Sequence, residues 1–328
     1  MTLLHHQELD RWRTAPVTSH DYPAIADFLA TTSGIGGRKF AADSRDIAEQ
    51  LDGAIPGAAV TVRDESGRVR GYAALSAPHG VEPELLADFV FEPDLAPNIV
   101  DDIVGVTVER FRQESNTVRG AYLRSFVSDQ QQATIDALEK RGARREGQFI
   151  RTRKPLKDED PRELQSVGRE GLDVLRWPDL ETRGLLEQVR VLQYDTFLEH
   201  FGNMSKTPEL WKHHLQSRLF TPDFSLAAVT GGGEVVGYVI GSTYTAGPAG
   251  ADERSAHTDY IGVRSDQRRQ GIAELLLKKI WLAALQRGLT VASLGTDINN
   301  RSNAHVLYAR LGYVAVEHSS AYQIDGSE

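Results

Sequence analysis

The 328-residue sequence contains no cysteine. The chain therefore forms no disulfide bond and has no thiolate nucleophile, and zinc or iron–sulfur sites built on cysteine are excluded as well. Histidine patterns typical of metal sites are also missing. His5-His6 and His213-His214 lack a spacing such as H-E-x-x-H, so we expect no metal.

The chain also lacks an excess of basic residues. Its 37 lysines and arginines stand against 46 aspartates and glutamates, which gives a net charge of −9 and a pI of about 5.6. Binding to phosphate backbones needs clustered basic side chains, so we do not expect nucleic acid as a partner. An acidic surface favours cationic partners or substrates, although the charge could equally serve only to keep the protein soluble.

Long apolar runs are the third absence. No stretch approaches the roughly 18–20 consecutive apolar residues that a membrane helix requires. Residues Met1 to Arg13 turn polar within five positions and contain no apolar core of signal-peptide length. The sequence therefore predicts a cytoplasmic protein that does not associate with membranes.

Length and composition divide the chain in two. At roughly 100–200 residues per domain, about two domains are expected. Residues 151–170 are rich in charges of both signs, contain two prolines and show almost no apolar periodicity, which is typical of a solvated linker. We expect a first domain at 1–154, a linker at 155–171 and a second domain at 172–328.

The two sides of this linker resemble each other, which indicates a tandem duplication. Each contains two β-rich runs around a glycine turn, at residues 58–76 and at residues 226–240. Short matches recur at nearly constant offsets of 169, 166 and 170: Val60-Thr61 with Val229-Thr230, Gly71-Tyr72 with Gly237-Tyr238, and Arg141-Gly142 with Leu311-Gly312.

Within each half the patterns predict the same order of elements. Two helical segments precede the hairpin, and a strand, a helix, a strand, a helix and a β-like tail follow it. The expected ranges are 19–31, 43–52, 85–91, 98–114, 121–127, 129–141 and 144–153 in the first half, and 179–200, 208–219, 257–263, 271–287, 290–295, 302–311 and 313–324 in the second. Strands mixed with crossover helices predict an α/β fold with a mixed sheet, present twice.

A helix start in the second half has the features of a phosphate site. A strand ending near Val263 runs into a short polar loop, and the next helix begins at Gly271. A glycine there lets a ligand approach the backbone, and the free N–H groups of a helix N-terminus favour phosphate. Arg268 and Arg269 add charge suited to phosphate. Taken alone, this motif fits a plain polar connection equally well.

A second motif follows at Thr296 to Tyr313 (TDINNRSNAHVLYARLGY). A strand ends in an asparagine-rich turn that can cap a helix beginning near Ser302. Tyr308 lies one helical turn after Ala304, and the helix stops at Gly312. Without further context, Tyr308 would be interpreted as a core residue.

The order of these pieces resembles the GNAT superfamily of acyl-CoA-dependent N-acetyltransferases. The resemblance rests on a strand, the helix start R-R-Q-G-I-A, a second strand and N-x-x-N-A-x-x-L-Y-x-x-L-G-Y, and it covers about residues 172–325. The duplicated layout is similar to tandem two-domain GNATs, such as mycothiol synthase-like proteins and acetyltransferases of antibiotic gene clusters.

The resemblance implies acetyl-CoA as cosubstrate and assigns it a set of residues. The segment 268–273 matches the family loop whose amides hold the pyrophosphate, with Ala273 in place of the usual last glycine. The N–H of Val263 would polarise the thioester carbonyl, and Tyr308 would protonate the departing thiolate. The coenzyme-binding residues implied are Ile261, Val263, Arg268, Arg269, Gln270, Gly271, Ile272, Ala273, Asn300 and Asn303.

The general base has several candidates. Asp259 and His257 share the strand face that carries Val263, so either is placed to take the amine proton directly or through water. We take Asp259 as the catalytic candidate. Glu199 and His200, in the segment before the expected substrate loop, are the alternatives.

The first half lacks both motifs. Its matching segment, Phe91 to Val100, has neither glycine nor arginine, and Pro97 stands just before the helix start. Leu138 occupies the place of Tyr308. We expect residues 16–154 to keep the fold without acetyl transfer and to form a wall of the active cleft, although proline at a helix start permits weak coenzyme binding.

The prediction is therefore an acetyl-CoA-dependent N-acetyltransferase whose second half acts on a small-molecule primary amine, such as an antibiotic, an amino sugar or a metabolite. A peptide or protein amine is the poorer option. A non-catalytic acyl-CoA-binding or sensing protein is the alternative from another class. The acceptor pocket is expected in the loops at 192–212 and 243–256, and the chain is expected to be a monomer or homodimer.

Overall fold

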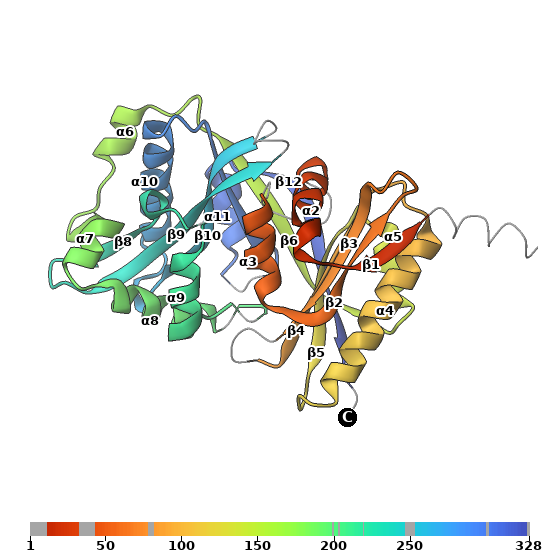
Figure 1. Ribbon diagram of the computed structural model, residues 1–328. Coiled ribbons are helices and arrows are strands. Elements are labelled where there is room, and N and C mark those ends of the chain that lie inside the picture. The colour runs from red at the N-terminus through yellow and green to blue at the C-terminus, as the bar shows by residue number, and fades with distance from the viewer. Residues whose placement is uncertain are drawn as a thin grey trace, which may run out of the picture. The chain divides into compact units, whose positions relative to one another are not determined.

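The structure, a computed structural model, describes residues 12–32, 43–77, 82–198, 200–202, 204–218, 220–246, 253–299 and 302–326. The described residues form two compact units, drawn in Figure 1. The first unit comprises residues 12–148 and 317–326. The second comprises residues 149–245 and 253–316. None of the helices within these described ranges is long and apolar enough to cross a membrane.

The first unit is a mixed sheet with the strand order β1-β2-β3-β4-β5-β12. The strands β2, β3 and β4 are antiparallel neighbours, whereas β4 and β5 run parallel and are joined by the crossover helix α4. Its elements are β1 (Arg13–Pro16), α2 (Tyr22–Thr31), α3 (Ser44–Asp52), β2 (Ala54–Arg63), β3 (Val69–Ser76), β4 (Glu84–Phe91), α4 (Pro97–Ser115), β5 (Tyr122–Ser128) and α5 (Gln132–Glu139).

The second unit repeats this plan with the strand order β6-β11-β10-β9-β8-β7. The parallel pair is β10 and β11, joined by the crossover helix α10. Its elements are β6 (Arg144–Pro155), α6 (Pro161–Ser166), β7 (Leu172–Arg176), α7 (Trp177–Thr182), α8 (Leu186–Phe197), α9 (Pro208–Gln216), β8 (Leu226–Thr230), β9 (Val235–Ala246), β10 (Glu253–Val263), α10 (Ile272–Gln286), β11 (Val291–Asp297), α11 (Ala304–Arg310) and β12 (Val314–Asp325).

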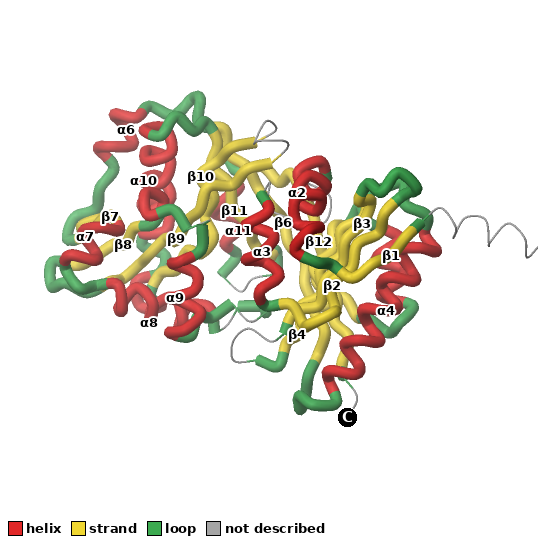
Figure 2. Tube along the Cα trace, viewed as in Figure 1, coloured by secondary structure: helices red, strands yellow, loops and turns green. Residues whose placement is uncertain are grey.

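Helices cover both faces of each sheet (Figure 2). In the second unit the alternation of side chains along β8 shows how the two cores divide. Leu226 and Ala228 pack into the core beneath α10, whereas Ala227 and Val229 pack into the core beneath α7, α8 and α9. Successive residues of a strand point to opposite faces, so one short apolar strand contributes to both cores.

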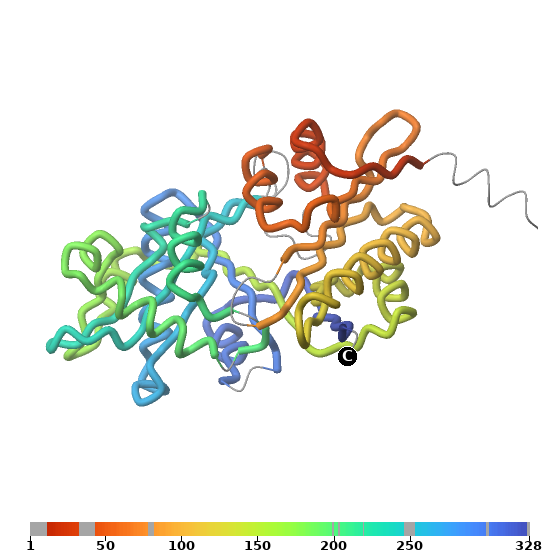
Figure 3. Tube along the Cα trace, turned by 60° about the horizontal axis from the view of Figure 1, so that its bottom comes forward, coloured from red at the N-terminus to blue at the C-terminus, as the bar shows by residue number. Residues whose placement is uncertain are grey.

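The two halves of the sequence exchange their closing strands, because each sheet ends in a strand from the tail of the other half. Residues 149–155 of β6 pair with β11 in the second unit, and residues 319–325 of β12 pair with β5 in the first. Figure 3 shows the blue end of the chain within the first unit. This division by contact differs from the boundaries predicted at 1–154 and 172–328, because residues 149–154 lie in the second unit and residues 317–326 in the first.

The segment predicted as a solvated linker is partly buried. Leu156 and Leu164 are buried in the second unit's core, and Lys279 on α10 donates hydrogen bonds to the carbonyl oxygens of Leu164 and Gln165 at 3.1 and 2.9 Å. The side chain of Asp160 caps the short helix α6 by accepting from the N–H of Arg162. The expectation of an entirely solvated connector is therefore wrong at Leu156 and Leu164, whereas most other residues of the segment are exposed.

The hairpins β2–β3 and β8–β9 confirm that the two halves resemble each other, but they correct one of the three sequence matches. Gly71 lies opposite Val62 and Gly237 opposite Ala228, so the offset is 166 on both strands. Both hairpins also shift register at the next pair. In this register Val229-Thr230 corresponds to residues 63–64, so its match with Val60-Thr61 was misplaced by three residues. A tight turn and its bulge fix the register, and a repeated dipeptide does not reveal either.

Two expected elements differ from those observed. The helix predicted over 179–200 is split into α7 and α8 at Gly184, whose φ of +68° is not helical. The loop predicted over 243–256 is strand at both ends, because β9 continues to Ala246 and β10 begins at Glu253. The residues between these strands lie outside the described ranges.

Candidate functional site

The parallel strands β10 and β11 separate along their length. They pair over only three positions, from Ala256 with Ala292 to Thr258 with Leu294. Beyond this point β11 continues in register with β6 as far as Asp297. Residues 260–263 of β10 pair with no residue in the described part of β11. An unpaired strand edge presents a row of backbone N–H and C=O groups that an extended ligand can bind.

The loop from β10 to α10 ends in an unusual backbone conformation. Arg269 has a φ of +61° and Gly271, the N-cap of α10, has a φ of +78°. No side chain caps this helix start, so its first N–H groups are available to an anion. A residue other than glycine rarely adopts a positive φ, so the backbone at Arg269 is strained. Backbone strain of this kind concentrates at functional sites.

The arginines of this loop differ in their contacts. Arg264 pairs with Asp266 at 2.7 Å and with Glu234 at 3.3 Å, so its charge is balanced by protein. Arg268 donates from Nε to the carbonyl oxygen of Val263 at 3.1 Å, which ties the loop to the strand end. Arg268 and Arg269 are both exposed, and the side chain of Ile272 is buried behind them while Ala273 is half-buried.

Sequence reasoning missed a further basic residue at this loop. Arg169, assigned to the linker, donates to the side-chain oxygen of Gln270 at 3.2 Å. Its guanidinium is also the nearest group to the position that a Cβ of Gly271 would occupy, at 3.7 Å. This contact could not be predicted from local sequence patterns, because 101 residues separate Arg169 from Gln270.

The helix α11 begins in the same way as α10. Its N-cap, Asn303, has a φ of +52°, makes no side-chain cap and is exposed. Arg269 and Asn303 are the only non-glycine residues with positive φ in the described ranges, and both were predicted to contact the coenzyme. Asn300, the other asparagine predicted, lies outside the described ranges.

Tyr308 projects from α11 into the core. It is 6% exposed, and its ring stands edge-on to Tyr313 with centroids 6.0 Å apart. Trp281 in turn donates from Nε1 to the hydroxyl of Tyr313 at 2.9 Å. Burial raises the pKa of Tyr308 well above its usual value. The phenol therefore stays protonated at neutral pH, as a proton donor must.

The candidates for the base lie in different surroundings. The structure brings His257 and Asp259 together, with Nε2 of His257 3.9 Å from Oδ1 of Asp259. His257 is fully buried, and its Nδ1 lies 2.9 Å from Oγ of Ser293. His200 instead stacks on Phe197 with centroids 4.3 Å apart. Glu199 lies outside the described residues.

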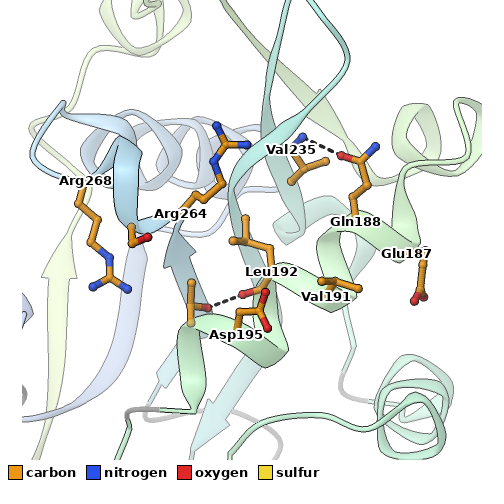
Figure 4. Close-up of a pocket in the computed structure, with 10 residues that line it drawn as sticks. Glu187, Gln188, Val191, Leu192, Asp195, Val235, Arg264 and Arg268 are labelled. Atoms are coloured by element: carbon orange, nitrogen blue, oxygen red, sulfur yellow. Dashed lines mark hydrogen bonds between the residues drawn. The ribbon is translucent and has the colours of Figure 1, made fainter.

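A cavity of about 480 Å³ lies beside the same loop (Figure 4). One wall is α8, which contributes Glu187 and Asp195, and the other is the loop that follows β10, together with Val235 of β9. Of the predicted coenzyme-binding residues only Arg268 lines this cavity. Its lining residues are Glu187, Gln188, Val191, Leu192, Asp195, Thr196, Val235, Arg264, Ser265 and Arg268.

The remaining histidines do not gather into a metal site. Burial lowers the pKa of His214 to about 4, so its ring is neutral at physiological pH, and it packs edge-on to Tyr260 at 5.5 Å. No group of three or more histidine, aspartate or glutamate side chains within the described ranges is arranged to hold a metal ion.

The matching region of the first unit has a different composition. The loop between β4 and α4 spans residues 92–96, against 264–271 in the second unit. Pro97 occupies the first turn of α4 and removes one N–H. Glu92 and Asp94 in this loop pair with Arg70. Leu138, at the place of Tyr308, is fully buried.

Comparison with known proteins agrees with this geometry. Residues 187–313 match the model of the acetyltransferase (GNAT) family. No relative among curated protein sequences matches the chain.

Solved structures match along nearly the whole chain. A GCN5-related N-acetyltransferase from Sphaerobacter thermophilus has a TM-score of 0.71 at 22% identity, over 97% of this chain and 98% of its own. A tandem GNAT protein from the clavulanic acid biosynthesis pathway has a TM-score of 0.65 at 17% identity, over 97% and 99%. N-myristoyltransferase of Saccharomyces cerevisiae has a TM-score of 0.58 at 10% identity, over 97% and 81%.

These identities are low, so the structural matches establish the fold, and the family model establishes the relationship of residues 187–313. The mixed α/β fold predicted from the sequence, in tandem, is confirmed. Residues 187–313 of the second unit match the acetyltransferase (GNAT) family, and nearly the whole chain has the fold of solved GNAT structures.

Proposed function

We propose that the second unit binds acetyl-CoA and transfers its acetyl group directly to a primary amine of a small molecule. One conjunction carries the proposal. Residues 260–263 of β10 pair with no described residue of β11, and the helices that follow these two strands, α10 and α11, both begin after a residue in the left-handed conformation and without a side-chain cap. Free N–H groups at uncapped helix starts next to an open strand edge suit a long, anionic, extended cosubstrate.

The coenzyme would supply an activated thioester, and the chain would hold it along this surface. Ile261 and Val263 would offer backbone groups of the open edge to the pantetheine arm. The N–H groups around Gly271 would bind the pyrophosphate, assisted by Arg268 and Arg269, because guanidinium groups match phosphate geometry. Gln270, Ile272, Ala273, Asn300 and Asn303 are assigned to the same site.

Tyr308 would act as the acid. As the amine attacks the thioester carbon, the bond to sulfur breaks and the thiolate needs a proton. Burial keeps the Tyr308 hydroxyl protonated, so it has that proton to give, and the N–H of Val263 would stabilise charge on the carbonyl oxygen. Positioning of the two substrates would contribute the rest, and no covalent enzyme intermediate is needed.

The acceptor is proposed as a small cationic amine rather than a peptide or protein amine. Asp195 and Glu187 line the cavity next to the loop, and the chain carries a net charge of −9. Residues 192–212, which include the ends of α8 and α9, remain the proposed acceptor segment. We propose further that the protein acts in the cytoplasm without metal, as a monomer or homodimer.

A screen of amines tests the proposal. Free CoA released from acetyl-CoA would be detected with a thiol reagent, to which the cysteine-free chain is silent. We expect release that depends on one class of small amine, and longer acyl-CoA donors in parallel would measure donor selectivity. Saturable binding of acetyl-CoA without release across the whole panel would instead support a non-catalytic sensor and would overturn the transferase proposal.

A further inference from the structure

A line of hydrogen-bonded polar side chains runs through the interior of the second unit. Glu253, Ser255 and His257 alternate along β10 and so share one face of the sheet, and Ser293 comes from the neighbouring β11. Oγ of Ser255 lies 2.8 Å from Oε1 of Glu253 and 2.8 Å from Oγ of Ser293. Oγ of Ser293 lies 2.9 Å from Nδ1 of His257.

All four side chains are buried. Glu253 is 5% exposed, and Ser255, His257 and Ser293 are 0% exposed. A buried polar group costs roughly 1–3 kcal/mol unless it is hydrogen-bonded. Four such groups in series therefore form a network whose members depend on one another.

An ion-pair cluster stands at one end of the line. Glu253 pairs with two arginines of β6, Arg151 at 3.1 Å and Arg153 at 3.0 Å. In these pairs the carboxylate faces two guanidinium donors. An ionised carboxylate accepts hydrogen bonds and donates none.

This carboxylate sets the direction of every bond in the line. Ser255 donates its single hydroxyl proton to Glu253, so it can only accept from Ser293. Ser293 therefore donates its own hydroxyl proton to Ser255, so it can only accept a hydrogen bond from His257. The proton of the neutral imidazole must then reside on Nδ1, which leaves Nε2 with the lone pair.

The lone pair of Nε2 lies beside Asp259, whose Oδ1 is 3.9 Å away. Tyr244 of β9 also faces the ring of His257, with ring centroids 5.8 Å apart, and the guanidinium of Arg151 of β6 lies over the Tyr244 ring at 4.7 Å. If Nε2 takes a proton, the resulting imidazolium faces Asp259 on one side and the line to Glu253 on the other. Both interactions favour the charged ring.

We propose that Glu253, acting through Ser255 and Ser293, holds His257 in its Nδ1–H tautomer so that Nε2 accepts the proton of the attacking amine. The inference rests on the proposed function. In the step, the amine nitrogen bonds to the acetyl carbon, its proton passes to Nε2 directly or through one water, and the proton that Tyr308 gives goes to the departing sulfur. His257 then returns its proton to solvent and Tyr308 takes one up from solvent, which restores both side chains. Glu253, Ser255 and Ser293 are positioning residues, and Asp259 supports the charged ring.

The tautomer is measurable without any activity. Long-range ¹H–¹⁵N correlation spectra of the full chain, labelled at histidine, report which ring nitrogen carries the proton, and His257→Asn identifies the signal. We expect the pattern of protonated Nδ1 in the wild-type protein. A pattern of protonated Nε2 would overturn the proposal, and this result needs no variant of the line to fold.

Variants of the line test its direction. In Ser255→Ala the Ser293 hydroxyl is free to donate to His257, so we expect the proton to move at least in part to Nε2. Ser242→Ala is the matched control, since Ser242 is buried in the same unit and is not part of the line. An unchanged His257 signal in folded Ser255→Ala and Ser293→Ala would show that the line does not set the tautomer.

Kinetics separate this proposal from the function on which it rests. We expect Ser255→Ala to lower kcat by about tenfold with the KM for acetyl-CoA unchanged, and Ser255→Thr to restore most of it. Transfer with an Nε2–H tautomer would overturn the inference and leave the function standing. An Nδ1–H tautomer in a protein that acetylates no amine would overturn the function, and with it the role of His257 as the base, while the control of the tautomer by Glu253 would stand.

Discussion

At equivalent positions of their two sheets, the two units carry side chains of different chemistry. Where β4 and β5 run parallel in the first unit, the row across the sheet reads Leu85, Leu123 and Ile324. Where β10 and β11 run parallel in the second, the row reads His257, Ser293 and Arg153. One row is entirely apolar, and the other is polar and hydrogen-bonded.

The two rows differ in what their burial contributes to the stability of the fold. Burying a leucine or isoleucine side chain stabilises a fold by about 1.5–3 kcal/mol, so the apolar row needs no other reason to exist. A buried polar row contributes little net stability, because its hydrogen bonds mainly offset the loss of water. The second unit therefore retains its polar row for a reason other than stability, and the proposed chemistry supplies one.

The same contrast appears at the helix that follows. In the first unit, Pro97 blocks one donor of α4, and Arg70 is held by the acidic residues of the preceding loop. In the second unit, Gly271 leaves the start of α10 open. Phe89 and Phe91 of β4 are buried where β10 has the half-buried Ile261 and Val263. At each of these places the first unit has ordinary core or surface where the second unit has the proposed binding surface.

The largest expected effect comes from making Tyr308 resemble its counterpart in the first unit. Tyr308→Phe removes only the hydroxyl, so we expect kcat to fall by about 100-fold or more while the affinity for acetyl-CoA is retained. Because burial raises the pKa of Tyr308 above 10.0, deprotonation of this residue should not reduce wild-type activity below about that pH. Steady-state kinetics against pH measure both points. Unchanged turnover in Tyr308→Phe would show that another group is the acid.

A moderate effect on acetyl-CoA binding is expected from replacing Arg169, which the fold brings next to the loop before α10. Arg169→Ala should weaken acetyl-CoA binding by about three- to tenfold at low salt, and by less at high salt, because an exposed charge near a phosphate is screened. Arg162→Ala is the control, since Arg162 is exposed on the same segment. Equal affinities for Arg169→Ala and Arg162→Ala at both salt concentrations would show that Arg169 does not contact the coenzyme.

The smallest effect tests the first unit directly. Leu138→Tyr restores the missing side chain but neither the loop nor the polar row, so we expect no gain of activity in a Tyr308→Phe background. The free energy of unfolding should fall by about 1–3 kcal/mol, because a larger, polar side chain enters a packed core. Activity recovered by the double variant would mean that the first unit still holds a working site.

Local patterns predicted most of the fold. The alternation of β2, β3 and β4 and the helical spacing of α4 and α10 are properties of neighbouring residues, and these elements lie where the sequence placed them. The exchange of closing strands was not predicted, because pairing between β12 and β5 is non-local and the tails of the two halves look alike in sequence.

The site was predictable only where it follows a family motif. Gly271 and Tyr308 stand in recognisable spacings, and Gly271 and Asn303 are residue types that tolerate a positive φ, whereas the positive φ of Arg269 could not be predicted. Glu253, Ser255 and Ser293 gave no signal. Serine and glutamate are common residues, and their line forms only when two strands that are 36 residues apart come into register.

The difference between the two units implies that the chain holds a single coenzyme site, in the second unit. Calorimetric titration with acetyl-CoA tests it most directly, in wild type, in Gly271→Glu and in the control Gly288→Glu, which adds the same charge at a glycine of equally positive φ past the other end of α10. The account predicts one site per chain in wild type and in Gly288→Glu, and none in Gly271→Glu, where charge and bulk meet the pyrophosphate. Two sites per chain, or one full site surviving in Gly271→Glu, would contradict it.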